Sequence, residues 1–294
     1  MKIVTNGSNK TRNIYNFFSK IIIVIVAGIV LLPIYMIFIN SFMNYDELNQ
    51  CITLSSNITD KYMSIKLIPS HFTFKQYITI LLESAKFNQS FWKSFEYSFL
   101  ITIGQVVLGT MAGFVFSRFD FKGRNVLFFI ILSAMLMPFQ VTMVPNYIVL
   151  NKLGLLNTDS AIILPGVFSA FGMFIMRQFM QHIPDNLVET AQIDGANTYS
   201  LFLKILLPQC KSGILALFIL CFVDTWNMIE QPLIFLSSEE KMPLSIVIRE
   251  ALNLSPETVF APCILFIMPA ICMFFTFERA LIEGVEAVWL GVKK

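Results

Sequence analysis

Long apolar runs without a single charged residue constrain this chain more than any other feature. A helix needs about 20 mostly apolar residues to cross a hydrocarbon core about 30 Å thick. Runs of this kind occupy residues 21–44, 97–117, 125–151, 160–176 and 258–277, and a sixth, 212–236, is interrupted only by two carboxylates. The sequence therefore predicts an all-α membrane protein with six transmembrane helices.

The composition supports a membrane protein and argues against several functional classes. Of the 294 residues, 56% are hydrophobic and 14% are charged, whereas soluble domains carry about 25% charged residues. The net charge of +2 is small and no basic run alternates with aromatic residues, so we expect no nucleic-acid partner. The five cysteines are scattered and the two histidines have no ligand cluster, so we predict neither a disulfide framework nor a metal site.

The spans divide the chain into five segments and fix an expected orientation. We expect a cytoplasmic N-terminus (1–20), a retained first transmembrane helix (21–44), an external segment (45–92) with some helix near 74–82, a permease core with five transmembrane helices (93–282) and a cytoplasmic C-terminus (283–294). Short loops rich in lysine and arginine lie on the same side as the N-terminus, and such loops remain in the cytoplasm. The chain is thus predicted to be multi-pass with both termini cytoplasmic.

Residues 183–208 form the most informative polar stretch. Pro184 suits the first turn of a helix, where its missing N–H costs nothing. Gly195 can adopt positive φ and end that helix in a sharp turn. A second helix can run over about 197–206, and we expect Pro208 to break it before the next span. The pattern predicts a helix-turn-helix on the cytoplasmic face, serving either as a docking element or simply as an ordinary surface loop.

This loop resembles the EAA loop of permease subunits of bacterial ABC importers, with the pattern E-A-A-x-x-D-G-A followed after a helix by L-P. The matching residues are Glu189, Ala191, Asp194, Gly195, Ala196, Leu207 and Pro208. Thr190 stands where the pattern has its first alanine. Flanking segments at 137–145, 153–158 and 226–233 resemble the carbohydrate branch, and particularly its smaller maltose-type permease. Glu230 and Gln231 depart from that branch, which usually has apolar or aromatic residues there.

The resemblance implies a type I ABC importer permease fold and a set of partners in the bacterial cytoplasmic membrane. Such a permease pairs with a second permease subunit as a heterodimer, and the two EAA loops dock on an ATPase dimer. An extracytoplasmic solute-binding protein delivers the solute, for which the branch implies a sugar or oligosaccharide. ATP and Mg would be bound by the ATPase, and this chain would bind no cofactor. Its nearest approach to a phosphate loop, residues 104–110, lacks the lysine, so we predict no catalytic residues and no enzyme activity.

A polar stripe is the candidate for a solute pathway. Asp224 lies about 12 residues into the fifth span, with Asn227 and Gln231 at i+3 and i+7 on the same predicted helix face. A carboxylate at mid-membrane depth faces protein or water rather than lipid. Gln140, beside a predicted proline kink, is a fourth candidate. These residues either line the pathway or hold helices together by hydrogen bonds.

Two other functions fit the hydropathy pattern alone. An ion-gradient-driven secondary transporter would need a coupling-ion site, often built from broken helices in two related halves. A membrane scaffold would carry no solute, and the polar stripe would then serve packing only. Neither alternative accounts for the residues of the 183–208 loop.

Overall fold

The computed structural model describes residues 7–48, 68–254 and 258–292. The predicted external segment 45–92 and the predicted C-terminus 283–294 therefore lie partly outside the described residues. The chain forms two compact units, Met1–Glu83 with Ala251–Leu265, and Ser84–Glu250 with Phe266–Lys294.

The first unit contains α1 (Gly7–Asn40), whose segment Phe18–Asn40 is long and apolar enough to cross a membrane. The helix ends four residues before the predicted boundary at 44. Its last turn has carbonyls without helical partners, and the buried side chain of Gln76 donates from Nε2 to the carbonyls of Asn40 at 3.1 Å and Met43 at 2.6 Å. Gln76 belongs to α3 (Lys75–Ile78), which continues as a π-helical turn, Thr79–Glu83, so the helix predicted near 74–82 is confirmed.

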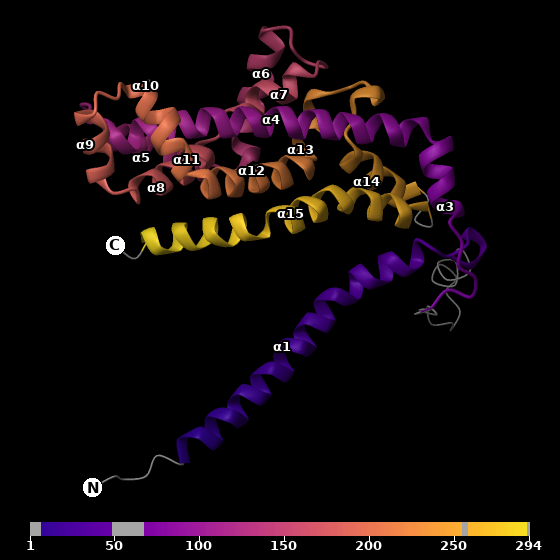
Figure 1. Ribbon diagram of the computed structural model, residues 1–294. Helices are drawn as coiled ribbons and strands as arrows, with labels where there is room; N and C mark the ends of the chain where they lie inside the picture. Colours follow the sequence, from indigo (N-terminus) through magenta and orange to yellow (C-terminus); the bar gives the residue numbers. More distant parts are fainter. Residues whose placement is uncertain (1–6, 49–67, 255–257, 293–294) are drawn as a thin grey trace. The chain divides into compact units, whose positions relative to one another are not determined.

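The second unit is built around α4 (Ala85–Arg118), a single 34-residue helix. Figure 1 shows α8 (Ala170–Gln181) and α12 (Lys211–Trp226) running alongside it. Glycines allow the close approach of α4 and α8: a Cβ atom at Gly109 would lie 2.7 Å from the backbone carbonyl carbon of Gly172, and one at Gly113 would lie 2.7 Å from Cβ of Met176. The two glycines, spaced four residues apart, thus form the small-residue face that lets membrane helices touch.

Three of the predicted continuous spans are broken helices. Residues 125–151 form α5 (Arg124–Met135) and α6 (Phe139–Lys152), bent by 98°. Pro138 begins the second of these, and a proline pushes the residue before it out of helical geometry. Residues 160–176 form α7 (Ser160–Val167) and the first part of α8, separated by two extended residues.

The fifth predicted span is also broken, between α12 and α13 (Glu230–Phe235). In a continuous helix the ring of Pro232 would clash with the carbonyl of Met228, four residues earlier. That carbonyl instead accepts a hydrogen bond from Oγ of Ser245 at 2.6 Å. Trp226, almost fully buried, ends α12 and donates from Nε1 to the carbonyl of Phe266 at 2.9 Å. The expected single helix over 212–236 is therefore wrong.

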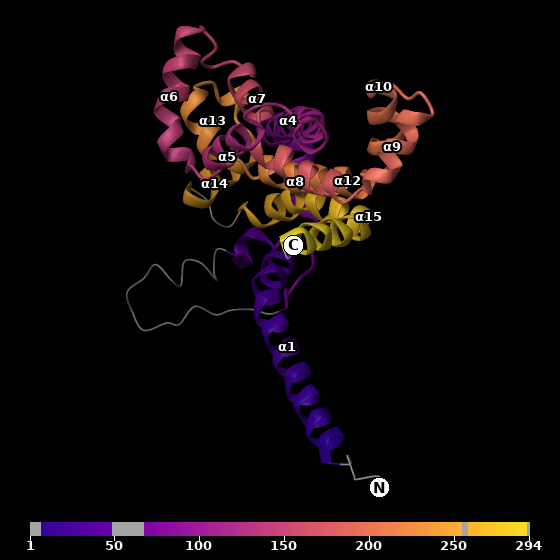
Figure 2. The same cartoon turned by 90° about the vertical axis from the view of Figure 1, so that its left-hand side faces the viewer.

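Residues 185–254 and 260–292 contain the remaining helical elements, of which 251–254 and 260–265 belong to the first unit. These elements are α9 (Asp185–Ile193), α10 (Thr198–Ser200), a π-helical turn (Leu201–Leu206), α11 (Leu207–Gln209), a 3₁₀ turn (Glu239–Lys241), α14 (Leu244–Leu254) and α15 (Phe260–Val292). Figure 2 places α6 and α13 on one side of α4, and α9 and α10 on the other.

The all-α membrane fold predicted from the sequence is confirmed. The described residues contain no strand. Four helices among them are long and apolar enough to cross a membrane, or up to six if each strongly bent pair forms one span. The exact number of six therefore stays a prediction.

Candidate functional site

The predicted turn at Gly195 is present, and it closes α9 with a Schellman motif. Gly195 has φ +85°. Its N–H donates to the carbonyl of Gln192 at 3.0 Å, and the N–H of Ala196 donates to the carbonyl of Ala191 at 2.9 Å. This pair of bonds satisfies carbonyls at the end of α9. Asn197 then begins the second helix, because its Oδ1 accepts a hydrogen bond from the N–H of Ser200 at 2.8 Å.

The inner face of the 183–208 loop belongs to the apolar core of the second unit. Ala191, Leu201 and Leu206 are buried in one cluster with Phe114 of α4 and Met176 of α8. The ring of Phe202 lies 4.8 Å, centroid to centroid, from the ring of Phe114. The loop is therefore packed onto α4 and α8 as part of the same apolar core.

The prediction that Pro208 breaks the second helix of the loop is wrong in its position, because the break lies two residues later, at Cys210. The helical chain continues through Pro208 and ends at Gln209, after which α12 begins with a bend of 74°. A proline removes one helical hydrogen bond and crowds the carbonyl four residues before it. Here it follows the π-helical turn Leu201–Leu206, and Cys210, with ψ of 13°, makes the break instead.

Arg118 joins α4 to the base of this loop. Its Nη1 lies 2.6 Å from Oδ1 of Asp185, the first residue of α9. Its Nη2 donates to the carbonyl of Met180 and to that of Ile183, the latter at 2.7 Å. The side chain is only 8% exposed, so its charge is held by these three oxygens. Arg118 fixes the end of α4 to the junction of α8 and α9.

The outer face of the loop is exposed and partly apolar. Glu189 and Asp194 project into solvent. Ile193 is 85% exposed and Tyr199 is 72% exposed. Glu189 and Ile193 are one helical turn apart on α9 and therefore share one exposed face, whereas Tyr199 lines an apolar pocket with Val107 and Met111 of α4.

A second group of polar residues lines a cavity between α4, α8 and α12. The break before α8 leaves the carbonyl of Gly166 without a helical partner, and Nε2 of Gln105 donates to it at 2.7 Å. Gln105, Ser169 and Asp224 contribute the polar lining of a cavity of about 320 Å³, with Phe171, Leu220 and Cys221 completing it. Unwound backbone at membrane depth is tolerated where it lines such a cavity.

The three residues of the predicted stripe do not share one helix face, because α12 ends at Trp226. Asp224 lines the cavity. Asn227 terminates α12, and its side chain donates back to the carbonyl of Val223 at 2.7 Å. Gln231 belongs to the separate helix α13. Gln140, at the start of α6, donates from Nε2 to Oε1 of Glu230 at 2.8 Å, so the carboxylate that departs from the resembled pattern has a partner.

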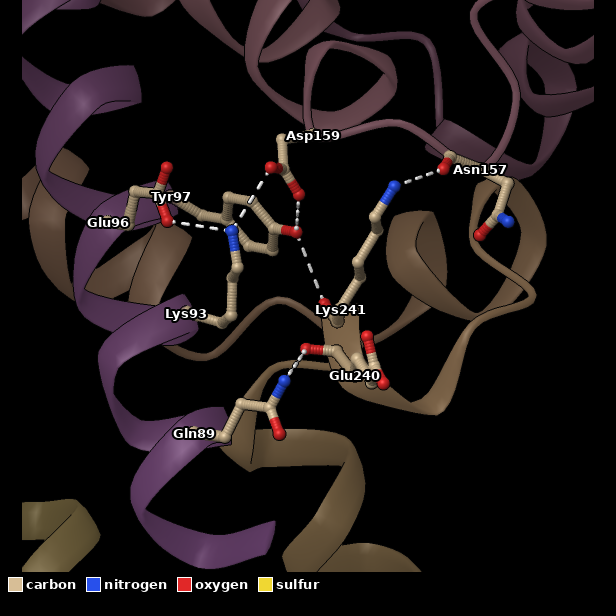
Figure 3. A network of polar contacts seen from close by, with 8 residues as sticks. All are labelled: Gln89, Lys93, Glu96, Tyr97, Asn157, Asp159, Glu240 and Lys241. Carbon is tan, nitrogen blue, oxygen red and sulfur yellow. Dashed lines mark hydrogen bonds and ion pairs between the residues drawn. The ribbon is translucent and has the colours of Figure 1, made fainter. Parts of the chain in front are cut away.

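A third polar group lies near the opposite end of α4 from Arg118 (Figure 3). The buried Tyr97 donates its hydroxyl to Oδ1 of Asp159 at 2.6 Å, and Nζ of Lys93 lies 3.1 Å from Oδ2 of the same carboxylate. Asn157, at φ 58°, receives a 2.6 Å hydrogen bond from Nζ of Lys241 on its carbonyl oxygen. The network ties α4 to the α6–α7 connection and to the 3₁₀ turn Glu239–Lys241.

The charge on Asp159 follows from these contacts. Partial burial opposes ionisation, but the hydrogen bonds from Tyr97 and Lys93 and the positive charge of Lys93 outweigh it. The pKa of Asp159 is consequently lowered from its usual value.

Sequence analysis did not identify Arg118, Gln105 or Asp159 as functional candidates. Gln105 carried a local signal, since it is a polar residue inside an apolar span. Arg118 and Asp159 carried none, because their partners lie more than 60 positions away. In the described part of the chain, no three His, Cys, Asp or Glu side chains gather to hold a metal ion.

Comparisons with known proteins agree with this architecture. Residues 105–285 match the family model of the binding-protein-dependent transport system inner membrane component. The arabinooligosaccharides transport system permease protein AraQ of Halalkalibacterium halodurans is 32% identical over 221 residues, which are 74% of this chain and 78% of that protein. The lactose transport system permease protein LacG of Rhizobium radiobacter is 32% identical over 66% of this chain and 72% of its own. The sn-glycerol-3-phosphate transport system permease protein UgpE of Yersinia enterocolitica is 30% identical over 68% of this chain and 73% of its own.

A solved structure shares the fold. One chain of a bacterial ABC transporter involved in the import of the acidic polysaccharide alginate superposes with a TM-score of 0.77 and 23% identity, covering 95% of this chain and 99% of that one. Residues 105–285, which match the family model, contain the residues that line the cavity, half of the residues of the Figure 3 network and the whole 183–208 loop. The chain belongs to the family of inner membrane components of binding-protein-dependent transport systems.

Proposed function

We propose that this chain is a transmembrane permease subunit of an ATP-driven sugar or oligosaccharide importer. Its family membership and its similarity to permeases named for arabinooligosaccharides and lactose support this function. The chain would form half of the translocation pathway and would not hydrolyse ATP. The family match favours this function over the ion-gradient-driven transporter and the scaffold.

The observation that carries the proposal is the construction of the 183–208 loop, which we now call the coupling loop. Its inner face is part of the core, and Arg118 ties its base to α4. Its outer face exposes Glu189 and Ile193. An ATPase subunit that binds this outer face can move the membrane helices as a packed body, which is how small shifts at one site are transmitted between two arrangements.

The proposed ATPase contact consists of two parts with different roles. Glu189, Asp194 and Gly195 lie on the exposed surface, where the two carboxylates can meet basic groups of the ATPase. The other matched positions shape or support the loop, and they are Ala191, Ala196, Leu207 and Pro208. ATP and Mg would be bound by the ATPase dimer.

The orientation and the other partners follow from this assignment. The coupling loop and both termini would face the cytoplasm of a bacterium, and the network of Figure 3 would lie near the outer surface. A solute-binding protein would dock on that outer side, near residues 237–257, part of which lies outside the described residues. A second permease subunit would complete the pathway beside Asp224 and its cavity, with Gln140, Asn227 and Gln231 as further candidate lining residues.

The first experiment is recovery of this chain from its native membrane in mild detergent, with its partners identified by mass spectrometry. We expect an ATPase, a second permease and a binding protein. Recovery of the chain alone, under conditions that preserve a known importer, would count against the proposal.

The coupling contact is tested by Glu189→Lys in the assembled complex. Charge reversal on an exposed side chain leaves folding intact, and we expect solute-stimulated ATP hydrolysis to fall at least 10-fold because a like charge then faces the ATPase. Asp120→Lys is the matched control, since Asp120 is an exposed carboxylate outside the loop whose contact is the ion pair to Arg124. Normal stimulation in the Glu189 variant would show that the coupling contact lies elsewhere.

A further inference from the structure

We propose that the pathway in this chain selects neutral or cationic sugars and rejects anionic ones, with Asp224 and Glu230 as its selecting charges. This inference rests on the proposed function and narrows its substrate class. It is supported by the position of two carboxylates near the cavity and the broken helices, together with the absence of lysine and arginine from the surrounding described segments.

Asp224 is positioned to meet a solute. It is exposed and lines the cavity of about 320 Å³ together with Gln105 and Ser169, a volume at the lower end of the range for small-molecule sites. Asp224 lies 13 residues after Lys211, the first residue of α12, which is about 20 Å along the helix and well inside the membrane. The amide, hydroxyl and carboxylate can hydrogen-bond sugar hydroxyls.

Glu230 adds a second exposed carboxylate at the start of α13. Gln140 donates one hydrogen bond to it, but an amide does not neutralise its charge. The ion pairs of the described residues involve the carboxylates of Glu96, Asp120, Asp159, Asp185, Glu239 and Glu250. Neither Asp224 nor Glu230 has a cationic partner among these described pairs.

Basic residues are missing from the same part of the membrane region. No lysine or arginine occurs in 98–117, 125–151, 153–176, 212–240 or 266–278, all of which the structure describes. The described lysines and arginines of the second unit lie outside these stretches, and Arg279 is the one that follows directly on the last of them, in the interior of α15. A solute that passes Asp224 and Glu230 therefore meets negative charge from this chain without a compensating positive charge.

The fold that this chain shares with its relatives does not by itself predict a preference for uncharged or cationic solutes. The matching structure comes from an importer of an acidic polysaccharide, and UgpE is named for sn-glycerol 3-phosphate, whereas AraQ and LacG are named for uncharged sugars. Relatives with one architecture thus serve solutes of both charge classes. Specificity of this kind comes from repulsive elements as well as attractive ones. A like charge at about 6 Å, with an effective dielectric constant near 20, weakens binding by roughly 100-fold.

The test uses the assembled importer in proteoliposomes with its binding protein. ATP-driven uptake is measured for lactose, arabinotriose, glucosamine, sn-glycerol 3-phosphate and an alginate trisaccharide. We expect the best solute to be uncharged or cationic, with both anionic solutes at least 10-fold slower. Preferred uptake of an anionic solute would overturn the charge inference and leave the proposed function standing. Absence of ATP-driven uptake for all five would remove the proposed function, and this inference with it.

A second measurement separates the charge selectivity of this chain from that of the binding protein. Glucose and glucuronate, which match in size, are compared for binding to the assembled complex without binding protein by saturation-transfer NMR. We expect Asp224→Asn to raise the glucuronate-to-glucose affinity ratio about 10-fold, and Glu230→Gln to raise it less. Asp120→Asn removes an exposed carboxylate that lies beyond the end of α4 and does not line the cavity, and it should leave the ratio unchanged. An unchanged ratio in both the Asp224 and Glu230 variants would overturn the assignment.

Discussion

The two ends of α4 are both held by polar contacts, but with different kinds of acceptor. At the coupling-loop end, the buried Arg118 binds two backbone carbonyls and one carboxylate. At the other end, Lys93 and Tyr97 converge on the side chain of Asp159, and the contact of Tyr97 with a backbone carbonyl, that of Lys241, is longer at 3.2 Å. A backbone carbonyl cannot turn away without moving its helix, whereas a carboxylate can change rotamer.

The difference in acceptors gives the two ends of α4 different mechanical properties. Arg118 makes α4 follow any displacement of the coupling loop, because the carbonyls of Met180 and Ile183 belong to the junction of α8 and α9. The Asp159 network can open and re-form with small changes in side-chain rotamer. We therefore expect disruption at the two ends to produce unequal effects.

The largest effect is expected from Gly109→Leu. This change disrupts the close contact between α4 and α8 in the part of α4 that lies between Tyr97 and Arg118. The new side chain would meet the backbone of Gly172 on α8, and backbone cannot yield as a flexible side chain does. We expect destabilisation of about 3 kcal/mol, at the upper end of the usual range for overpacking, and loss of assembled complex. Thermal unfolding in detergent measures it. Gly28→Leu, where a Cβ atom meets nothing within 4 Å, is the control, and equal stability of the two variants would contradict the prediction.

A smaller and more selective effect is expected from Arg118→Met. The change leaves two carbonyls without their charged donor and costs about 2–3 kcal/mol. Solute-stimulated ATP hydrolysis should fall more than the amount of assembled complex does, because the loop is no longer tied to α4. Arg124→Met removes a nearby arginine that pairs with exposed Asp120 and should leave coupling intact. Parallel loss in both variants would refute a specific role for Arg118.

The smallest effect is expected from Asp159→Asn. An amide oxygen still accepts from Tyr97, so only the ion pair with Lys93 is lost. Because the Asp159 side chain is 35% exposed, the loss should be below about 1 kcal/mol. Asp159→Ala, which also leaves the buried Tyr97 hydroxyl without this acceptor, should cost more. A larger loss for the asparagine variant than for Arg118→Met would reverse the comparison between the two ends.

The pH dependence of thermal stability tests the contribution of the Asp159 ion pair. Since the pKa of Asp159 is lowered in the folded chain, its contribution to stability is complete above the unfolded pKa of about 3.9 and disappears as pH falls through the folded value. The wild-type protein should therefore be more stable than the Asp159→Asn variant at neutral pH, and this difference in stability should disappear only below about pH 4. Thermal melting of both proteins between pH 3 and pH 7 measures this. A constant difference across that interval would argue against the ion pair.

Local sequence patterns predicted much of the coupling loop. A glycine that ends a short helix requires only its neighbours, and Gly195 adopts the expected positive φ. Gly109 and Gly113 have the four-residue spacing that is typical of close contacts between membrane helices, and the structure contains such a contact there. Apolar runs predicted the membrane fold, because their length is set by the thickness of the bilayer.

The broken helices and the long-range polar contacts were decided by the tertiary structure. Pro232 is a local signal for a break, but the partner of the carbonyl of Met228 is Ser245 of another helix, which only the folded chain brings within hydrogen-bond distance. The partners of Arg118 and Tyr97 lie more than 60 residues away in sequence, so no local pattern identifies them. The sequence alone determined where the chain is apolar and where it turns, since both depend on neighbouring residues. Only the folded chain decided which polar groups meet, because a buried donor takes the acceptor that tertiary packing brings within reach.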